Sequence, residues 1–248
     1  MTTILVTGGT GVLGRHVTER LRTDGHDVRV LSRHSEPYAV DLREGTGLDA
    51  AVQGADVIVH CASTPRGGDE RAARNLIEAA RRAGVPHLLY ISIVGVDRVP
   101  IGYYRTKFAV ERQIEASGLG WTILRTTQFH DLLVQLFQVL SRLPVLLLPA
   151  GVRDQPVEVA EVADRLAELA LGGPAGRVPD MAGPQTRSLP DFARAWMRAT
   201  GRRRPILNVP VPGKGFRGLR EGGHLTPGRA VGEGTFAEYL GRRFGGRG

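Results

Sequence analysis

Three glycines near the N-terminus have the spacing of a phosphate-binding loop. Gly8, Gly11 and Gly14 follow the apolar residues 4–6 and open a segment whose apolar residues recur at helical spacing. Glycine permits a tight turn and a close approach of a pyrophosphate to the backbone, and the helix N-terminus offers N–H groups and a positive dipole end. The loop therefore predicts a dinucleotide site, and a purely structural turn is the alternative. The site would contain Gly8, Thr10, Gly11, Val12, Leu13 and Gly14.

The residues after the second predicted strand bear on the choice between the two nicotinamide dinucleotides. An acidic residue there would bind the ribose hydroxyls of NAD, but the chain has Ser32 and Arg33. The forked guanidinium of Arg33 suits a 2′-phosphate, and Ser32 could add a hydroxyl donor. Arg15, on the first turn of the preceding helix, could approach the same phosphate. We expect NADP(H) to be preferred, with NAD(H) possible, and a solvated surface role is the alternative for Arg33.

Further cofactor contacts follow from position alone, because ligands of open α/β sheets lie beyond the carboxyl ends of the strands. An acidic side chain there could accept a hydrogen bond from the adenine amino group, and small residues would let the adenosine ribose approach. Ordinary loop roles are the alternative. The residues concerned are Asp41 and Leu42, Ala62 and Ser63, and Thr126.

A tyrosine and a lysine are placed to carry chemistry. Tyr103 and Lys107 share one helix face, and that helix follows the strand 87–93, whose end carries Ser92. A lysine cation beside a tyrosine lowers the pKa of the phenol, which can then exchange a proton with a carbonyl or alcohol oxygen while a nicotinamide moves a hydride. We therefore predict Tyr103, Lys107 and Ser92 as catalytic residues, with Lys107 also at the nicotinamide ribose. A helix whose Tyr and Lys only pack is the alternative, and Tyr104 is the acid if the register shifts by one.

Three residues after the strand 121–124 would lie near the nicotinamide end of such a site. Gln128 and Phe129 could flank the ring, and His130 could contact the substrate. A lone histidine is more often structural, so that interpretation of His130 stays open.

Strands and helices alternate over the first half of the chain. This pattern predicts right-handed crossovers and a doubly wound parallel α/β sheet, a Rossmann fold. The predicted strands are 4–6, 28–31, 39–40, 56–60, 87–93 and 121–124, and the predicted helices are 12–24, 71–83 and 103–116.

The pattern changes after about residue 126. Predicted helices at 129–142, 159–171, 189–200 and 235–243 are separated by Pro- and Gly-containing segments, and 201–234 is rich in loops. We expect a single domain over 1–248, in which the small C-terminal segment 126–248 contributes most of the substrate-side cap.

Composition sets further bounds. A length of 248 residues suits one large α/β domain, and the single cysteine, Cys61, excludes an intrachain disulfide. The longest apolar stretch, 132–148, is interrupted by polar residues and Pro144, so a buried helix with a loop is expected rather than a membrane span. No leader segment is recognised. We expect a cytoplasmic protein with no membrane partner and no metal.

The net charge of +8 is concentrated at the C-terminal end, where residues 201–248 carry ten Lys and Arg against three Glu. Such a stretch could attract nucleic acid or an anionic substrate. It is rich in glycine, has few aromatic residues and lacks a nucleic-acid motif. We therefore expect a solvated basic surface, no nucleic-acid partner, a small-molecule substrate, and either a monomer or a homodimer.

Several segments together resemble atypical short-chain dehydrogenases/reductases, and most of all their NmrA-like, NAD(P)H-binding branch, often labelled nucleoside-diphosphate-sugar epimerase. The resemblance implies a Rossmann fold and NADP(H) binding over essentially the whole chain. In members that keep the pair, Tyr103 and Lys107 resemble the catalytic residues and Ser92 their serine partner. The segments are 7–14 (TGGTGVLG), 90–97 (YISIVGVD), 103–107 (YYRTK), 124–129 (LRTTQF) and 234–240 (GTFAEYL).

Three functions are compatible with these features. The first is an NADPH-dependent oxidoreductase that reduces a small, apolar carbonyl or quinone with Tyr103 as proton donor. The second is a non-catalytic NADP(H)-sensing regulator that binds a protein partner, which needs the glycine loop and Arg33 but not Tyr103. The third is a nucleotide-sugar epimerase or dehydratase, against which Arg33 and the short interval between Ser92 and Tyr103 both argue.

Overall fold

The structure, a computed structural model, describes residues 1–64 and 67–245. Contacts divide the chain into two compact units, which are described in turn. Unit 1 contains Met1–Ser92, Gly102–Arg125 and Val162–Pro179, and unit 2 contains Ile93–Ile101, Thr126–Glu161 and Asp180–Gly248.

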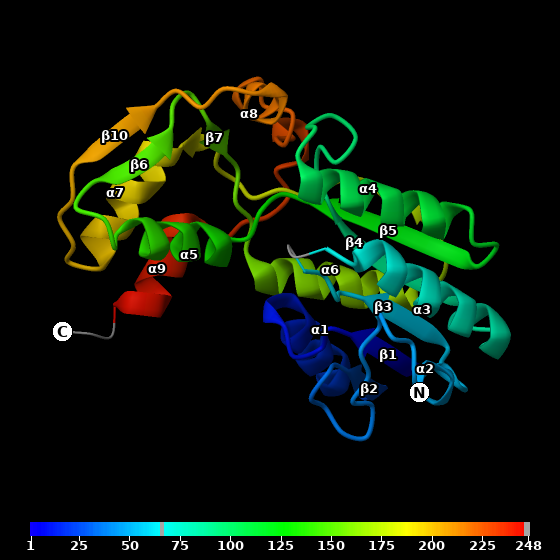
Figure 1. Ribbon diagram of the computed structural model, residues 1–248. Helices are drawn as coiled ribbons and strands as arrows, with labels where there is room; N and C mark the ends of the chain where they lie inside the picture. The colour runs from blue at the N-terminus through cyan, green and yellow to red at the C-terminus, as the bar shows by residue number, and fades with distance from the viewer. Residues whose placement is uncertain (65–66, 246–248) are drawn as a thin grey trace. The chain divides into compact units, whose positions relative to one another are not determined.

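Unit 1 is built on a six-stranded sheet with the order β2-β1-β3-β4-β5-β8 (Figure 1). β1 pairs in parallel with β2 on one side and with β3 on the other, β3 with β4, and β5 with β8. From β1 the chain continues to β2 on one side of the sheet and then returns to β3 on the other side. Ligands of such sheets bind at this change of direction, between β1 and β3. The strands are β1 (Thr3–Thr7), β2 (Asp27–Leu31), β3 (Val57–His60), β4 (His87–Ile93), β5 (Gly120–Thr126) and β8 (Gly176–Arg177).

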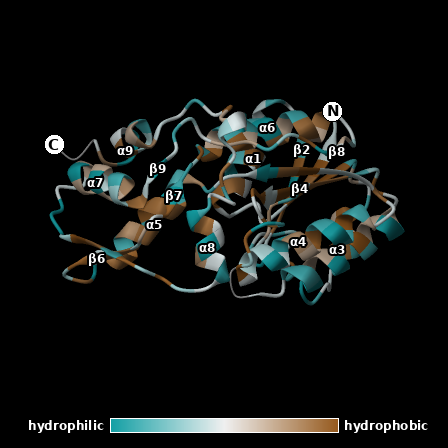
Figure 2. Ribbon diagram, turned by 90° about the horizontal axis from the view of Figure 1, so that it is seen from above, coloured by the Kyte–Doolittle hydropathy of each residue, from teal (hydrophilic) through white to brown (hydrophobic). Residues whose placement is uncertain are grey.

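Helices cover both faces of this sheet. Figures 1 and 2 show α3 and α4 on one face and α1 and α6 on the other. β3 and β4 are buried along their whole length, as expected for strands covered on both sides. The helices are α1 (Val12–Thr23), α2 (Leu48–Val52), α3 (Asp69–Ala83), α4 (Gly102–Glu115) and α6 (Val159–Leu171).

The interior of unit 1 also contains a buried ion pair. Arg125 on β5 donates from Nη2 to a carboxylate oxygen of Glu111 on α4 at 2.6 Å, and the two side chains are only 4% and 1% exposed. A second hydrogen bond, from Arg125 Nε, makes the pair bidentate. The pair therefore ties α4 to the sheet with two charges removed from water.

Unit 2 is organised around an aromatic core rather than a large sheet. Phe137, Phe192, Trp196, Phe236 and Tyr239 pack together in it. β6 pairs in parallel with β10, and β7 pairs antiparallel with β9. The elements are α5 (His130–Leu140), β6 (Leu146–Pro149), β7 (Arg153–Asp154), β9 (Arg187–Ser188), α7 (Leu189–Ala199), β10 (Ile206–Val209), α8 (Lys214–Arg220), the 3-10 turn η1 (Pro227–Arg229) and α9 (Phe236–Phe244).

The predicted doubly wound parallel sheet is confirmed, with one strand as an exception. Residues 39–40 form only a single bridge, between Ser32 and Ala39, rather than a strand. The reason is a turn that starts at Asp41, whose carbonyl accepts hydrogen bonds from the N–H groups of Glu44 and Gly45. The short elements α2, β6, β10 and α8 were not predicted.

The apolar stretch 132–148 is only partly as expected. It forms the predicted helix and loop, as α5 followed by a turn and β6, but α5 is buried on one face only. Within the described ranges 1–64 and 67–245, no helix is both long and apolar enough to cross a membrane.

Candidate active site

Two glycines of the β1–α1 loop are required by the close approach of neighbouring backbone. Gly8 has a φ of +67°, and a Cβ there would lie 2.7 Å from the Cα of Ala62, after β3. A Cβ on Gly14 would collide with the carbonyl oxygen of Gly8. The loop is thus held against the end of β3 with no room for side chains, as a backbone cradle for a pyrophosphate requires.

The N-terminus of α1 presents backbone donors at this loop. Gly11 is the N-cap in an extended conformation, and the first helical hydrogen bond runs from Arg15 N to Gly11 O at 3.1 Å. The N–H groups of Val12, Leu13 and Gly14 precede that bond and have no partner within the helix. The first turn carries no acidic residue that would repel an anion. These features fit the diphosphate of a dinucleotide.

After the end of β2, one arginine has no acidic partner among the described residues, and a nearby aspartate is paired with another arginine. Arg33 is exposed and forms no ion pair with any residue in the described part of the chain. Asp41 is bound by Arg43, and this hydrogen bond, with a smaller contribution from the charge of Arg33, lowers the pKa of Asp41 to about 2. Ser32 donates or accepts in a 2.7 Å hydrogen bond with Ser35. The Asp41–Arg43 pair was not predicted. Because Asp41 is occupied by Arg43, the guanidinium of Arg33 is left to bind an anionic ligand.

A hydrogen-bonded chain of three side chains lies at the ends of β3 and α4. The Tyr103 hydroxyl lies 2.8 Å from Ser63 Oγ, and Ser63 Oγ donates to a carboxylate oxygen of Asp69 at 2.5 Å. Asp69 is buried at the start of α3 and also accepts the N–H of Thr64 at 3.0 Å. Because the only proton of Ser63 points to Asp69, its oxygen is left to accept the proton of Tyr103.

Lys107 does not pair with Tyr103 as the sequence predicted. Its side chain is buried, donates to the carbonyl of Ile91 at 2.8 Å, and lies over the Tyr90 ring with Nζ 4.5 Å from the centroid. Burial lowers the pKa of Lys107 to about 8, opposed by the charge of Asp69. The expected lowering of the Tyr103 pKa is therefore wrong: burial raises the pKa, and the hydrogen bond with Ser63 opposes this in part.

Ser92, the third predicted catalytic residue, lies near the end of β4 and is 1% exposed. Its hydroxyl has no hydrogen-bond partner among the residues that the structure describes. Buried hydroxyl groups are normally satisfied, so an orphan one at the carboxyl end of a central strand is a natural partner for a ligand.

Two further predicted cofactor residues of unit 1 have structural contacts. The Ala62 N–H donates to Thr7 Oγ1 at 3.4 Å, close to the glycine loop. Leu42 is buried, and its carbonyl accepts from Asn75 Nδ2 at 2.8 Å. Both residues therefore help to fix the loops that follow the strands.

Unit 2 contains the remaining predicted residues. Thr126 is buried and accepts the N–H of Val94 at 2.9 Å, while Gln128 and Phe129 are half-buried. His130 is 1% exposed, and its Nε2 lies 3.1 Å from the carbonyl of Gly234.

The surroundings of His130 favour the structural interpretation that was left open. Its ring packs against both Phe236 and Tyr239, with centroid distances of 5.5 and 5.2 Å. Burial lowers its pKa to about 4, so the ring is neutral at physiological pH. A neutral, aromatic-flanked histidine is a core residue of unit 2.

Asp69 is the site residue that sequence reasoning missed. The helix was predicted to begin at residue 71, whereas α3 begins at Asp69. The available signal was an acidic residue in the first helical turn, after a strand and a loop that contains a serine, because acidic side chains favour that helix position. Only the fold shows that this carboxylate reaches back to Ser63.

Comparison with known proteins supports the cofactor. The sequence profile of a family described as NAD(P)H-binding matches residues 8–170. An uncharacterised protein of Mycobacterium tuberculosis is 33% identical over 183 residues, which are 68% of this chain and 20% of that protein. The chain thus spans about a fifth of that relative's length.

Reductases are among the other similar proteins. The (4-alkanoyl-5-oxo-2,5-dihydrofuran-3-yl)methyl phosphate reductase of Streptomyces griseus is 32% identical over 80% of this chain and 74% of its own length. The Escherichia coli quinone oxidoreductase 2 is 25% identical over 83% of this chain and 77% of its own length. In a structure comparison, the E. coli NADPH-dependent quinone oxidoreductase complexed with NADPH aligns over 97% of this chain and 99% of its own with a TM-score of 0.81, at 21% identity.

These findings agree with the geometry of the loop and the end of β3. The predicted Rossmann fold and the predicted nicotinamide dinucleotide are confirmed at the level of the family. The chain belongs to the NAD(P)H-binding family.

Proposed function

We propose that this protein is an NADPH-dependent reductase of a small, apolar carbonyl or quinone, with Tyr103 as the proton donor. The observation that carries the proposal is the hydrogen-bonded chain from Tyr103 through Ser63 to Asp69. The names of two relatives, a quinone oxidoreductase and a reductase of an alkanoyl-substituted compound, support the same class of reaction.

When bound, the reduced nicotinamide supplies the hydride. The proton comes from the chain's own residues. Burial raises the pKa of Tyr103, so its hydroxyl keeps a proton throughout the neutral range and acts as an acid toward a carbonyl oxygen. Ser63 holds the phenol oxygen in place, because its own proton is committed to the Asp69 carboxylate.

Lys107 adds a buried basic side chain to the proposed site. Its ammonium is fixed by the carbonyl of Ile91 and by the face of Tyr90. In this proposal it binds the nicotinamide ribose and favours the electron-rich product of proton transfer, rather than ionising Tyr103 beforehand. Ser92, whose hydroxyl is buried without a partner, donates to the substrate oxygen.

The preference for NADP(H) rests on Arg33. Its exposed guanidinium has no acidic partner in the described residues, and the nearby carboxylate of Asp41 is bound by Arg43. A 2′-phosphate would supply the missing anion with bidentate geometry. Gln128 and Phe129 remain the proposed substrate contacts, and residues 126–248 remain the proposed source of most of the substrate-side cap.

The test compares Tyr103→Phe with Tyr104→Phe, its buried neighbour on the same helix. Oxidation of NADPH is followed with a panel of quinones and aromatic ketones, and NADPH affinity is measured by titration. We expect Tyr103→Phe to lower kcat by ~10²-fold or more and to leave the Kd for NADPH within about twofold, while Tyr104→Phe keeps its turnover. Equal turnover of the wild type and Tyr103→Phe would overturn the role of Tyr103. Tight NADPH binding with no turnover of any compound, together with a protein partner that is captured only in one redox state, would instead support a sensor.

A further inference from the structure

An apolar stripe runs along the outer face of α5 in unit 2. Leu132, Leu136 and Val139 recur at intervals of four and three residues, and Leu143 continues the row beyond the helix end. Their side chains are 47%, 36%, 57% and 47% exposed. The opposite face, with Leu133, Val134 and Phe137, is buried in the aromatic core. A helix that is apolar on both faces but buried on only one leaves a hydrophobic surface without a partner.

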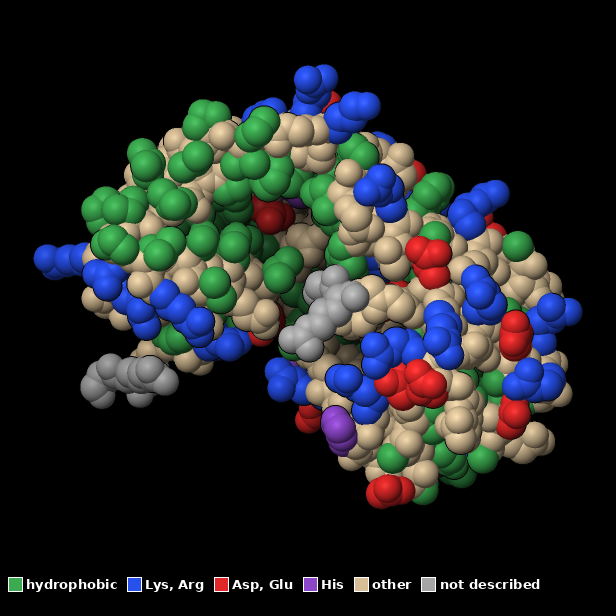
Figure 3. Space-filling view, in the orientation of Figure 1, with side chains coloured by type: hydrophobic (Ala, Val, Ile, Leu, Met, Phe, Trp, Pro, Cys, Tyr) green, Lys and Arg blue, Asp and Glu red, His purple; other side chains and the backbone are tan. Residues whose placement is uncertain are grey.

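The pair of strands that follows α5 exposes leucines as well. Leu147 of β6 and Leu207 of β10 lie opposite each other in register and are 41% and 55% exposed. Figure 3 shows that hydrophobic side chains gather on one face of unit 2, over β6, β10 and α5, and that a row of Lys and Arg side chains borders them. We call Val139, Leu143, Leu147 and Leu207 the apolar face.

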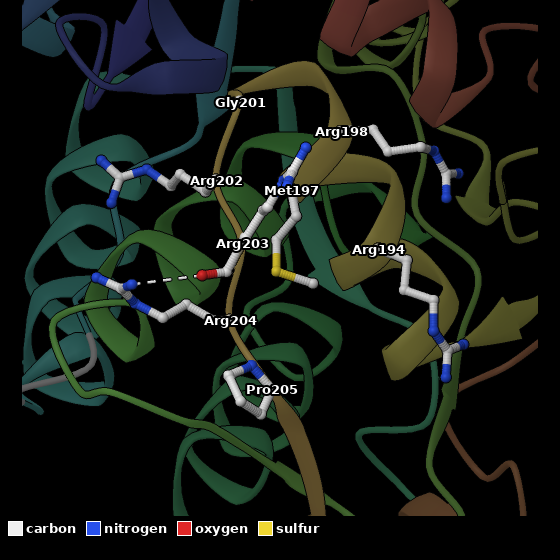
Figure 4. Close-up of a pocket in the computed structure, with 8 residues that line it drawn as sticks. All are labelled: Arg194, Met197, Arg198, Gly201, Arg202, Arg203, Arg204 and Pro205. Atoms are coloured by element: carbon white, nitrogen blue, oxygen red, sulfur yellow. Dashed lines mark hydrogen bonds between the residues drawn. The ribbon is translucent and has the colours of Figure 1, made fainter.

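Five arginines are among the residues that line a hollow of about 660 Å³ beside this face, and Figure 4 shows the side chains of Arg194 and Arg198 pointing to one side and those of Arg202 and Arg204 to the other. They come from the end of α7 and the loop that leads to β10, and Arg202 donates to Ser141 Oγ, at the end of α5, at 3.2 Å. Among the residues that the structure describes, Asp191 is the acidic partner of Arg194, and the other four arginines form no ion pair. The arginines are Arg194, Arg198, Arg202, Arg203 and Arg204.

Carboxylates stand at the borders of the two sequence segments around these features, at Asp131, Asp154, Asp191 and Glu221. Residues 132–153 and 192–220 together carry ten Lys and Arg and no Asp or Glu. Nine of these ten cations are arginines, whose forked guanidinium matches the oxygens of a phosphate. The surface therefore has strong charge complementarity to phosphate groups next to an apolar phase.

We propose that this surface docks the protein onto an anionic phospholipid bilayer, with the arginines at the headgroup phosphates and the apolar face against the acyl chains. The proposal goes beyond the reductase function and revises the sequence expectation that no membrane takes part. Docking from the water side needs no spanning helix.

Other occupants fit the same surface less well. A second copy would bring one arginine cluster against another, because a twofold interface pairs a surface with itself. A nucleic acid would use aromatic side chains to stack bases, and the exposed apolar residues here are all aliphatic. Protein interfaces also concentrate their binding energy in aromatic residues, whereas aliphatic side chains suit lipid chains.

The test is co-sedimentation of the full chain with vesicles of phosphatidylcholine alone or mixed equally with phosphatidylglycerol. We expect binding to the mixed vesicles only, and a fall in binding at high salt because exposed charges are screened. Each basic side chain near an anionic surface strengthens partitioning roughly fivefold, so Arg203→Glu combined with Arg204→Glu should weaken it by ~25-fold or more. Leu143→Asn should weaken it roughly tenfold through lost apolar burial.

Matched controls come from unit 1. Leu171 is 46% exposed, close to the 47% of Leu143, so Leu171→Asn tests an exposed leucine outside the surface. Arg81→Glu tests an exposed arginine of α3 in the same way. Both controls should bind as the wild type does, and all variants should keep the NADPH affinity of the wild type.

Three results would overturn the proposal. The first is that the wild type does not bind to mixed vesicles. The second is that the Leu171 and Leu143 variants lose vesicle binding equally. The third is that the protein forms a dimer without vesicles and that Leu143→Asn dissociates this dimer. Vesicle binding needs no turnover, and turnover of a water-soluble quinone needs no vesicle. Failure of this proposal is therefore distinguishable from failure of the reductase function.

Discussion

The two units differ in the side chains that we single out in their interiors and on their surfaces. Unit 1 buries the ion pair of Glu111 with Arg125, and its buried Asp69 accepts a hydrogen bond from the exposed Ser63. Unit 2 buries an aromatic core and leaves leucines and arginines on its surface. A buried polar pair fixes the position of each atom, whereas an exposed apolar or basic patch adapts to its partner. The two proposals follow this difference, because they assign chemistry at defined atoms to unit 1 and recognition of a larger surface to unit 2.

The largest expected effect tests the buried pair of unit 1. Glu111→Ala leaves the Arg125 guanidinium buried without its carboxylate, and we expect the free energy of unfolding to fall by about 3–5 kcal/mol. The measurement is chemical denaturation followed by circular dichroism. In contrast, Arg194→Ala in unit 2 breaks an exposed ion pair and should cost about 0–1 kcal/mol.

A double variant separates the charge from the packing in this comparison. Replacing both Glu111 and Arg125 by leucine removes the two charges together, and it should cost much less than Glu111→Ala because no buried charge is left unpaired. If Glu111→Ala and Arg194→Ala cost the same, the contrast between the buried pairs of unit 1 and the surface pairs of unit 2 is wrong.

The pH dependence of stability tests the buried histidine of unit 2, His130. The folded pKa of His130 is about 4, below its ordinary value of 6.5, because burial disfavours the charged ring. The unfolded chain therefore binds a proton that the folded chain rejects. Above pH 6.5 the ring is neutral in both states, so His130 does not reduce the free energy of unfolding. As the pH falls from 6.5 toward 4, protonation of the unfolded chain lowers the free energy of unfolding by up to about 3 kcal/mol.

The measurement for His130 is the free energy of unfolding as a function of pH for the wild type and for His130→Phe. Phenylalanine keeps an aromatic ring against Phe236 and Tyr239 but has no titrating group. The variant should lose less stability than the wild type between pH 6.5 and 4. Parallel curves would show that His130 does not titrate as its burial implies.

Much of unit 1 could be predicted because its signals are local. The strand 87–93 and the helix 159–171 have the predicted bounds, since continuous apolar runs and helical periodicity fix them. The pairing of β6 with β10 joins segments about sixty residues apart, and neither carries a strand signal of its own. Elements that exist only through such contacts cannot be read from one segment of sequence.

The site shows the same limit at the level of single side chains. The glycine spacing is dictated by the backbone itself, so it could be predicted. Tyr103 and Lys107 do share a helix, but the lysine ammonium donates to the carbonyl of Ile91. Which partner a flexible side chain chooses depends on burial and on the acceptors that the fold brings near, such as the carboxylate of Asp69 for Ser63.

The Asp69–Ser63–Tyr103 chain gives the next prediction. Asp69→Asn frees the proton of Ser63 from its carboxylate acceptor and loosens the position of the Tyr103 oxygen. We expect kcat to fall by roughly tenfold or more, less than for loss of the acid itself, with the KM for NADPH unchanged.

Ser63→Ala supplies the control for this positioning role. Because both residues act through Tyr103, the double variant Ser63→Ala/Asp69→Asn should be no slower than the worse single variant. Additive losses would show two independent effects, and a parallel fall in NADPH affinity would show that Asp69 only supports the loop at residue 64.

The last prediction concerns Arg33, an exposed cation of unit 1 that we assign to recognition of the 2′-phosphate. Arg33→Ala removes a charged hydrogen-bond donor from the proposed 2′-phosphate site, so the affinity for NADPH should fall by roughly tenfold to a hundredfold while that for NADH stays within about twofold. Arg81→Ala removes the same charge from the far end of α3 and should change neither affinity. If Arg33→Ala weakens both dinucleotides equally, the arginine supports the loop and does not read the phosphate. In that case recognition by surface arginines would be confined to unit 2, and the contrast between the two units would be sharper than proposed.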